Sequence, residues 1–177
     1  MKLTRTERWI LSNQLSILAI LDPEHIADYE QSRKIIEDGY EYLYENCISY
    51  ISPEGETFLV EKSRKVLDIL DMFRAIYSSL RELDEISDID VEGLRFHGFD
   101  GNNETEYMVF AEFFCKEFDG GRYPEVVEHL ESFNTHYPIL ESYNRMLEEW
   151  EKCENKFHLS KEQLLKIQNA TIHPKYK

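Results

Sequence analysis

Apolar residues recur every three or four positions along most of the chain, a spacing that places them on one face of an α-helix. The pattern is strongest between residues 58 and 83, where two adjoining apolar rows run the length of the segment. These rows contain Val66, Leu70, Phe73, Tyr77 and Leu80, with Ile69, Ile76 and Leu83 beside them. The segment is therefore predicted to be the central helix of the hydrophobic core.

Local signals mark where the first two helices begin and end. Thr4 and Glu7 have the spacing of a capping box, in which each side chain satisfies a backbone amide at the start of a helix. A helix is predicted over residues 3–21, and its apolar residues are Ile10, Leu11, Leu15, Ile17, Leu18 and Leu21. A second helix is expected to begin at Asp22 and Pro23, with Asp22 accepting its first amides, and to end at Gly39.

Start signals also predict the helices of the second half of the chain. They are Asn103 with Glu106, then Pro124, Pro138, and finally Ser160 with Gln163 as a second capping box. Both prolines are expected at the first position of their helices. The helix after Asn103 is expected to bury Tyr107, Phe110, Ala111, Phe114 and Phe118.

The fold predicted from these patterns is all-α, with about seven helices in a single multihelical domain over residues 1–170. Residues 171–177 are expected to form a flexible C-terminal tail. Residues 40–51 fit two patterns, because Tyr40, Tyr42 and Tyr44 alternate as in a strand while the wider spacing is helical. A helix is the preferred interpretation there, and an extended turn is predicted for residues 94–100.

Charge changes the range of expected partners. The chain has 177 residues, with 20 Lys and Arg against 35 Asp and Glu, and a formal net charge of −15. General binding to nucleic acid is not expected, because such affinity depends mainly on basic side chains that contact phosphates. Both ends are basic and the middle is acidic, which leaves open solubility, electrostatic contact between subunits, or mimicry of DNA by carboxylates.

The sequence also predicts a compartment. No apolar run approaches the roughly 20 residues of a membrane span, so no membrane insertion is expected. The three cysteines, Cys47, Cys115 and Cys153, are far apart in the sequence. This distribution is typical of reduced thiols rather than of a disulfide framework or a zinc site. A cytoplasmic protein is therefore expected.

Several short strings, taken in order, resemble the bacterial YfbU family. They are Ile10-Leu11-Ser12-Asn13-Gln14, Leu21-Asp22-Pro23, Gly98-Phe99-Asp100, Gly121-Arg122-Tyr123, Phe133-Asn134, Tyr143 with Arg145-Met146-Leu147, Trp150, and His158-Leu159-Ser160. The resemblance implies an all-helical cytosolic fold that tends to self-associate, and it supplies no catalytic residue or cofactor. Residues 40–57 depart most from the family pattern, being longer and richer in tyrosine.

One pair of residues has the spacing of a known catalytic motif. Arg122 and His129 are separated as in metal-independent helical ribonucleases of the HEPN type, where such a pair acts on the ribose 2′-hydroxyl and the phosphate. The spacing is unspecific, since about one such pair is expected by chance in a chain of this composition. The alternative is structural: Arg122 pairs with Asp119 or Glu125, and His129 is exposed.

No metal ion or cofactor is predicted. Asp100, Asn102, Glu104 and Glu106 alternate like the oxygen ligands of a calcium loop. However, Thr105 occupies the position that requires glycine, and Ala111 occupies that of the bidentate glutamate. The sequence also lacks a phosphate-binding glycine loop and a nucleophile elbow.

Two groups of residues, most of them aromatic, remain as binding candidates. Phe96, His97, Phe99, Arg122 and Tyr123 flank glycine-rich breaks at both ends of one predicted helix, where loops often carry binding residues. The alternative is that the phenylalanines fill the core and Tyr123 leads into the next helix. The tyrosines of residues 40–44 are likewise either an interface or part of the core.

The leading hypothesis is a noncatalytic helical interaction or regulatory module that acts as a homo-oligomer, with a further protein partner that the sequence does not identify. The alternatives are the ribonuclease with Arg122 and His129 and, more weakly, an acidic DNA mimic.

Overall fold

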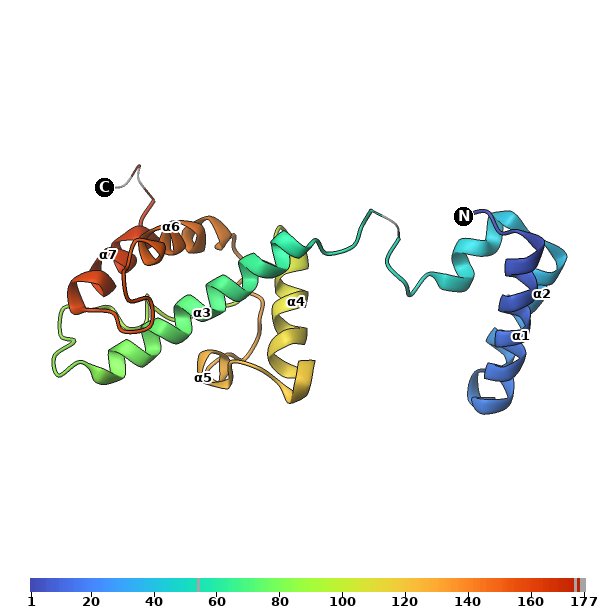
Figure 1. Ribbon diagram of the computed structural model, residues 1–177, viewed down its shortest axis with the longest axis horizontal. Helices are drawn as coiled ribbons and strands as arrows, with labels where there is room; N and C mark the ends of the chain where they lie inside the picture. The colour runs from blue at the N-terminus through green and yellow to red at the C-terminus, as the bar shows by residue number, and fades with distance from the viewer. Residues whose placement is uncertain (54, 174, 176–177) are drawn as a thin grey trace. The chain divides into compact units, whose positions relative to one another are not determined.

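The computed structural model describes residues 1–53, 55–173 and 175, and regular structure in this part of the chain is helical (Figure 1). An isolated bridge between Phe99 and Asn134 is the β-type pairing found there. The all-α prediction is confirmed. Internal contacts divide the chain into two compact units, Met1–Thr57 and Phe58–Lys177. The single domain over residues 1–170 stays a prediction.

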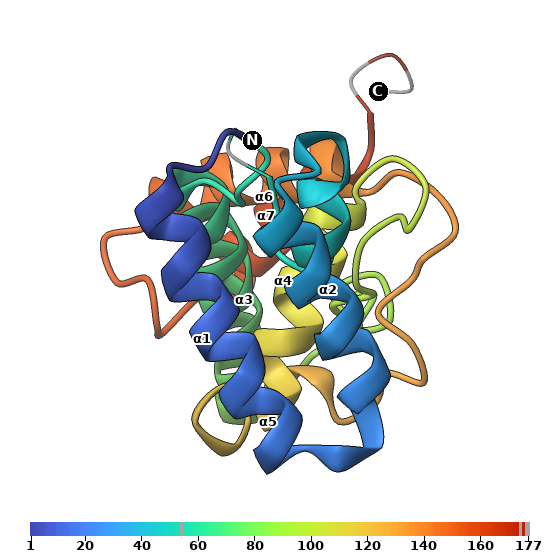
Figure 2. The same ribbon diagram turned by 90° about the vertical axis from the view of Figure 1, so that its right-hand side faces the viewer.

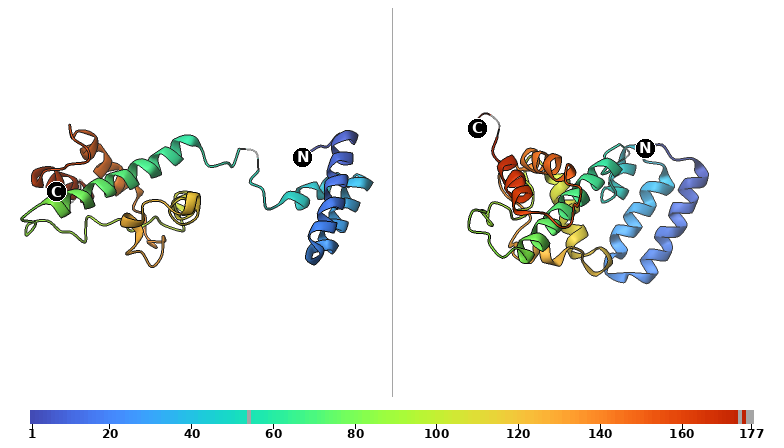
Figure 3. Two further views of the ribbon diagram at one scale, coloured as in Figure 1. Left: turned by 60° about the horizontal axis from the view of Figure 1, so that its bottom comes forward. Right: turned by 60° about the vertical axis from the view of Figure 1, so that its left-hand side comes forward.

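The first unit is a helical hairpin followed by a 3-10 segment. Helix α1 spans Arg5–Leu21, a short 3-10 turn spans Pro23–His25, and α2 spans Ile26–Asp38. Figures 2 and 3 show α1 and α2 side by side and antiparallel. The predicted capping box of Thr4 and Glu7 is present. Gly39 ends α2 in the left-handed conformation, with φ of 74°, as its sequence position predicts.

Two expectations for the first unit need correction. Asp22 does not cap the second helix, because its carboxylate instead accepts a hydrogen bond from the Tyr29 hydroxyl at 2.9 Å and lies 3.0 Å from His25 Nδ1. Pro23 accordingly begins the 3-10 turn rather than α2. Residues 41–48 are helical, as preferred over a strand, but they form the 3-10 segment Glu41–Ile48.

The second unit contains the remaining α-helices. They are α3 Val60–Glu82, α4 Thr105–Lys116, α5 Pro124–Val127, α6 Leu140–Glu151 and α7 Lys161–Thr171, with a 3-10 turn at Phe118–Gly120. In the described residues this makes seven α-helices, of which α5 is a single turn. Among them, no helix has both the length and the apolar content needed to cross a membrane.

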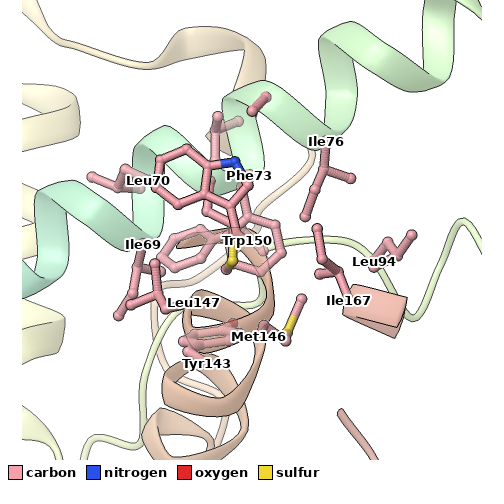
Figure 4. Close-up of a cluster of buried hydrophobic side chains, with 14 of the residues drawn as sticks. Ile69, Leu70, Phe73, Ile76, Leu94, Tyr143, Met146, Leu147, Trp150 and Ile167 are labelled. Carbon is pink, nitrogen blue, oxygen red and sulfur yellow. The ribbon is translucent and has the colours of Figure 1, made fainter. Parts of the chain in front are cut away.

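Helix α3 is the centre of the core of the second unit, as predicted. Its buried residues are Val66, Ile69, Leu70, Met72, Phe73, Ala75, Ile76 and Ser79. Helices α6 and α7 pack on this face, with Met146, Leu147, Trp150 and Ile167 among the buried side chains (Figure 4). The rings of Phe73 and Tyr143 meet edge to face with centroids 5.2 Å apart, and Phe96 stacks on Tyr143 at 5.8 Å.

The predicted extended turn at residues 94–100 runs through this core. Its buried amides need hydrogen-bond acceptors, and tyrosine hydroxyls supply two of them. The Phe96 amide donates to the Tyr77 hydroxyl and the His97 amide to the Tyr143 hydroxyl, both at 2.9 Å. The Phe99 amide and carbonyl pair with the strand-like segment 133–135 at 2.8 and 3.0 Å.

The start of α4 differs from its prediction. Asn103 does not cap this helix, which begins at Thr105 without a side-chain cap, because the Asn103 amide instead donates to the Asp100 carboxylate. Glu104 has a different role. Its carboxylate accepts hydrogen bonds from the Ile139 and Leu140 amides at 3.0 and 2.8 Å, and so caps α6 from outside that helix.

The last two helix starts have opposite outcomes. Pro138 was expected at the first position of a helix, but α6 begins two residues later, where the cap from Glu104 satisfies its amides. Pro124 does occupy the first position of α5. The capping box of Ser160 and Gln163 is present, and α7 extends to Thr171. Residues 174, 176 and 177 of the predicted tail lie outside the described residues.

Gly98 lies in the loop of residues 94–100, and a substitution there tests how tightly the core holds this loop. Its φ is +91°, and a Cβ added there would overlap the backbone carbonyl of Phe133. We expect Gly98→Ala to lower the free energy of unfolding by about 3 kcal/mol or more, because neither backbone segment can move aside. Urea denaturation followed by circular dichroism measures this loss.

The matched control is Gly120→Ala. Gly120 also has a positive φ, +78°, but no atom lies within 4 Å of the added Cβ. We expect this variant to lose about 1–2 kcal/mol, the strain of the left-handed conformation alone. Equal losses in the two variants would show that the overlap at Phe133 is not important.

Candidate interaction surface

Three of the five aromatic-loop candidates are buried. Phe96 and Phe99 have no exposed surface, so the core alternative describes them. Tyr123 is also buried, and it directly precedes α5 as that alternative expected. Its hydroxyl donates to Asp71 at 2.8 Å, and the Arg74 guanidinium lies 3.9 Å from its ring centroid. Burial and the Asp71 carboxylate raise the pKa of Tyr123.

The proposed catalytic pair lies in two different environments. Arg122 is exposed and forms an ion pair with Asp119 at 3.5 Å, one of its two expected structural partners. His129 is half-buried rather than exposed, because its Nε2 lies 2.8 Å from the Phe96 carbonyl and its ring contacts Tyr77. Since a carbonyl only accepts, Nε2 carries the proton in this bond.

A shallow hollow of about 220 Å³ surrounds His129. It is lined by Tyr77, Leu80, Arg81, Val91, Arg95, Glu125, Glu128 and His129. Arg122 is not among these residues. Several of the charges are already paired: Glu125 with Arg74 at 2.6 Å and Arg95 with Glu92 at 2.9 Å. Burial raises the pKa of Tyr77 to about 12, so its phenol stays protonated near neutral pH.

The calcium-like residues form an internal network. The Asp100 carboxylate accepts from the Asn102 amide at 3.1 Å and from the Asn103 side chain, and these bonds lower its pKa. Glu104 caps α6 through Oε1, and its Oε2 accepts a hydrogen bond from the Asp100 backbone amide at 3.0 Å. In the described residues, no three His, Cys, Asp or Glu side chains are arranged to hold a metal ion.

The first unit presents a different kind of surface, because the side of α1 that faces α2 mixes polar residues with Leu11, Leu15 and Ala19. Arg8 donates to the Glu37 carbonyl at the end of α2 at 3.4 Å, and the Ser12 hydroxyl donates to the Glu37 carboxylate at 2.6 Å. One turn further, Arg33 of α2 donates to the Ser16 hydroxyl at 3.3 Å. Positions 8, 12 and 16 therefore mark the inner face of α1.

The opposite side of α1 is apolar and exposed. Ile10, Ile17 and Leu21 are 46%, 55% and 74% exposed, and their spacing of seven and four places them in one row. Trp9 and Ile20, at 67% and 78%, are also exposed, but they lie at the side of α1 nearer α2, where Trp9 lines a hollow with Glu37 and Ile20 lines one with Ile26. We call these five exposed residues the outer face of α1. Positions 9–21 contain no charged residue.

The hairpin has almost no core of its own. None of the 17 residues of α1 is buried, and the described part of the first unit buries only Ile36 and Tyr44. A hollow of about 480 Å³ remains beside the hairpin, lined in part by Leu15, Leu18, Ile35 and Leu43. These exposed apolar side chains make α1 the candidate interaction surface of the first unit.

Comparison with known proteins identifies the chain's relatives. The model of the YfbU domain matches residues 1–170. The chain belongs to the YfbU family. It is similar to the UPF0304 protein MJECS11 of Methanocaldococcus jannaschii, with 35% identity over 177 aligned residues that cover 95% of this chain and 99% of the relative. The name of that relative states no activity. The matched YfbU region includes the whole first unit and residues 58–170 of the second.

Sequence reasoning missed the outer face of this YfbU protein. It placed Ile10, Leu11, Leu15, Ile17 and Leu21 on one amphipathic helix, although the structure puts Leu15 beside α2 and Ile17 on the opposite side. The signal that could have found the face is the absence of charge from positions 9–21. An amphipathic surface helix normally has a charged face, and this stretch has none.

The ribonuclease alternative makes a direct prediction. We expect this YfbU protein not to cleave single-stranded RNA in the presence of EDTA, because Arg122 pairs with Asp119 while His129 is bonded to a core carbonyl. Gel analysis of end-labelled RNA measures cleavage. The control is His129→Ala: cleavage by the unmodified protein that falls by about 10² to 10⁴-fold in this variant, with helical content unchanged, would contradict the prediction.

Proposed function

We propose that this YfbU protein is a noncatalytic helical interaction module that acts as a homo-oligomer, and that the outer face of α1 is its subunit interface. The observation that supports this is the exposure of five large apolar side chains on one helix of a unit that buries two of its described residues. Covering that face removes apolar surface from water at about 25 cal/mol per Å². Trp9 at its edge is the residue type most enriched among energetically important interface positions.

Charge supports a self-interface at this place. With a net charge of −15, two copies repel each other over most of their surfaces. Positions 9–21 of α1 carry no charge, so two such faces can meet without burying like charges. A two-fold dimer is the simplest closed assembly in which one surface covers itself.

The proposal places this function in the cytoplasm. All three cysteines are free, and two of them, Cys115 and Cys153, are buried thiols whose pKa is raised by burial. Free thiols are typical of a reducing compartment. The proposal also includes a further protein partner, for which the dimer would be the regulatory unit.

A single charge on the outer face tests the proposal. We expect the unmodified chain to be a dimer at micromolar concentration, and Ile17→Glu to raise the dissociation constant of the dimer about a hundredfold or more. The reason is that a two-fold interface would bury the new carboxylate twice, without a partner. Ile17 is 55% exposed, so the substitution leaves the core of each copy intact. Light scattering over a concentration series measures the mass.

The matched control is Val109→Glu on α4. Val109 is also 55% exposed and apolar, but it lies in the second unit. We expect Val109→Glu to leave the dimer unchanged. If the unmodified chain is monomeric in moderate salt, or if both variants dissociate equally, the proposed interface is wrong.

A further inference from the structure

We infer that the hollow around His129 binds a small zwitterion of the α-amino-acid class, one with a short apolar side chain. The carboxylate of this ligand bonds to Arg81 and to the Tyr77 hydroxyl, and its ammonium group bonds to Glu128 and to the His129 ring. The inference concerns the second unit alone, and it does not depend on the interface proposed for α1.

Tyr77 and His129 form the rigid part of the wall of this hollow, because both are bonded to the backbone of one core residue. The Phe96 amide donates to the Tyr77 hydroxyl at 2.9 Å, and His129 Nε2 donates to the Phe96 carbonyl at 2.8 Å. The two rings are also in contact, with centroids 6.2 Å apart. These contacts fix where both side chains lie before a ligand binds, which lowers the entropic cost of binding.

Each of these two side chains keeps one polar group without a partner among the described residues. The Tyr77 hydroxyl accepts from Phe96, but its own hydrogen has no acceptor there. Burial raises the pKa of Tyr77 to about 12, so this hydrogen is present near neutral pH. His129 donates through Nε2, which leaves Nδ1 of the neutral ring as an acceptor. The hollow therefore offers a donor for a carboxylate and an acceptor for an ammonium group.

Two opposite charges line the same hollow without pairing with each other. Arg81 lies in the last turn of α3, and Glu128 directly follows α5. Neither side chain forms an ion pair or a hydrogen bond with another residue in the described part of the chain. The other charged side chains of the lining, Glu125 and Arg95, are paired with residues outside the hollow. A ligand that carries both charges bonds Arg81 and Glu128 at once.

Charge and volume limit the class of ligand. A simple anion is repelled by the two glutamates of the lining, in a chain of net charge −15, and a simple cation is repelled by its two arginines. The volume of about 220 Å³ is below the roughly 300–1,000 Å³ of pockets for drug-sized molecules. Leu80 and Val91 supply apolar surface for a short aliphatic side chain.

Isothermal titration calorimetry on the full-length chain tests the site, with L-valine as the probe. Two matched probes each lack one charge: isobutylamine has no carboxylate, and 3-methylbutanoate has no amine. We expect L-valine to bind at least tenfold more tightly than either, because only L-valine bonds to both sides of the hollow. A tenfold ratio is about 1.4 kcal/mol, close to the contribution of one hydrogen bond to a charged group.

Single substitutions locate the bound probe. We expect Arg81→Gln and Glu128→Gln each to weaken the binding of L-valine about tenfold or more, since each removes one charge from the hollow. Both side chains are exposed and unpaired in the described part of the chain, so neither substitution disturbs the fold. The matched controls are Arg64→Gln on α3 and Glu131→Gln, two exposed positions outside the hollow. We expect both controls to bind L-valine as the unmodified chain does.

Three results would overturn the inference. Absence of binding at millimolar L-valine means that the hollow is not a site for this class of ligand. Equal binding of L-valine and a probe with one charge means that the hollow recognises that charge alone. Binding that is unchanged in both Arg81→Gln and Glu128→Gln places the ligand elsewhere on the chain. None of these results depends on the mass of the assembly, so each leaves the proposed homo-oligomer to its own test.

Discussion

The fold of the second unit depends on how it supplies hydrogen-bond partners to a segment of backbone that passes through its core. Residues 94–100 form the backbone hydrogen bonds of neither a helix nor a sheet along most of their length, yet Phe96 and Phe99 are fully buried. The cost of burying their backbone is offset by the hydroxyls of Tyr77 and Tyr143, which accept the amides of Phe96 and His97. Because those tyrosines come from α3 and α6, the same two bonds fix the loop between the two helices.

The aromatic residues that were candidates for binding are instead packed into the core by this arrangement. Phe96 packs on Phe73 and Tyr143, and its carbonyl accepts the hydrogen bond from His129. Tyr123 is held between Asp71 and Arg74. Substituting any of them would disturb the core, so loss of function in such a variant would carry no information about chemistry. The outer face of α1 is the opposite case, because its side chains are large, apolar and exposed.

Much of the fold could be predicted from the sequence, because its signals are local. The capping boxes at Thr4 and Ser160 and the terminator Gly39 each act within a few residues, and each was predicted. The starts of α4 and α6 were misplaced because their determinants are distant: Glu104 caps a helix that begins 36 residues later. The exposed row on α1 escaped prediction for a related reason. The periodicity of apolar residues indicates that one side of a helix is apolar, but it does not indicate which element packs against that side.

The sequence strings that carry the YfbU resemblance fall into two groups, those whose residue types are explained by packing inside one unit and those whose residue types are not. One β-bridge and its hydrogen bonds join Gly98-Phe99-Asp100 to Phe133-Asn134 and hold the loop of residues 94–100. Packing inside the second unit therefore accounts for the residue types of these two strings. Ile10 to Gln14 and Leu21 lie on α1, where Arg8 and Ser12 donate hydrogen bonds to Glu37 of α2 and Ser16 accepts one from Arg33. Contacts within the first unit do not account for isoleucine and leucine on the other side of that helix. An uncharged apolar row, set in a chain of net charge −15, has a physical reason when a second such row covers it.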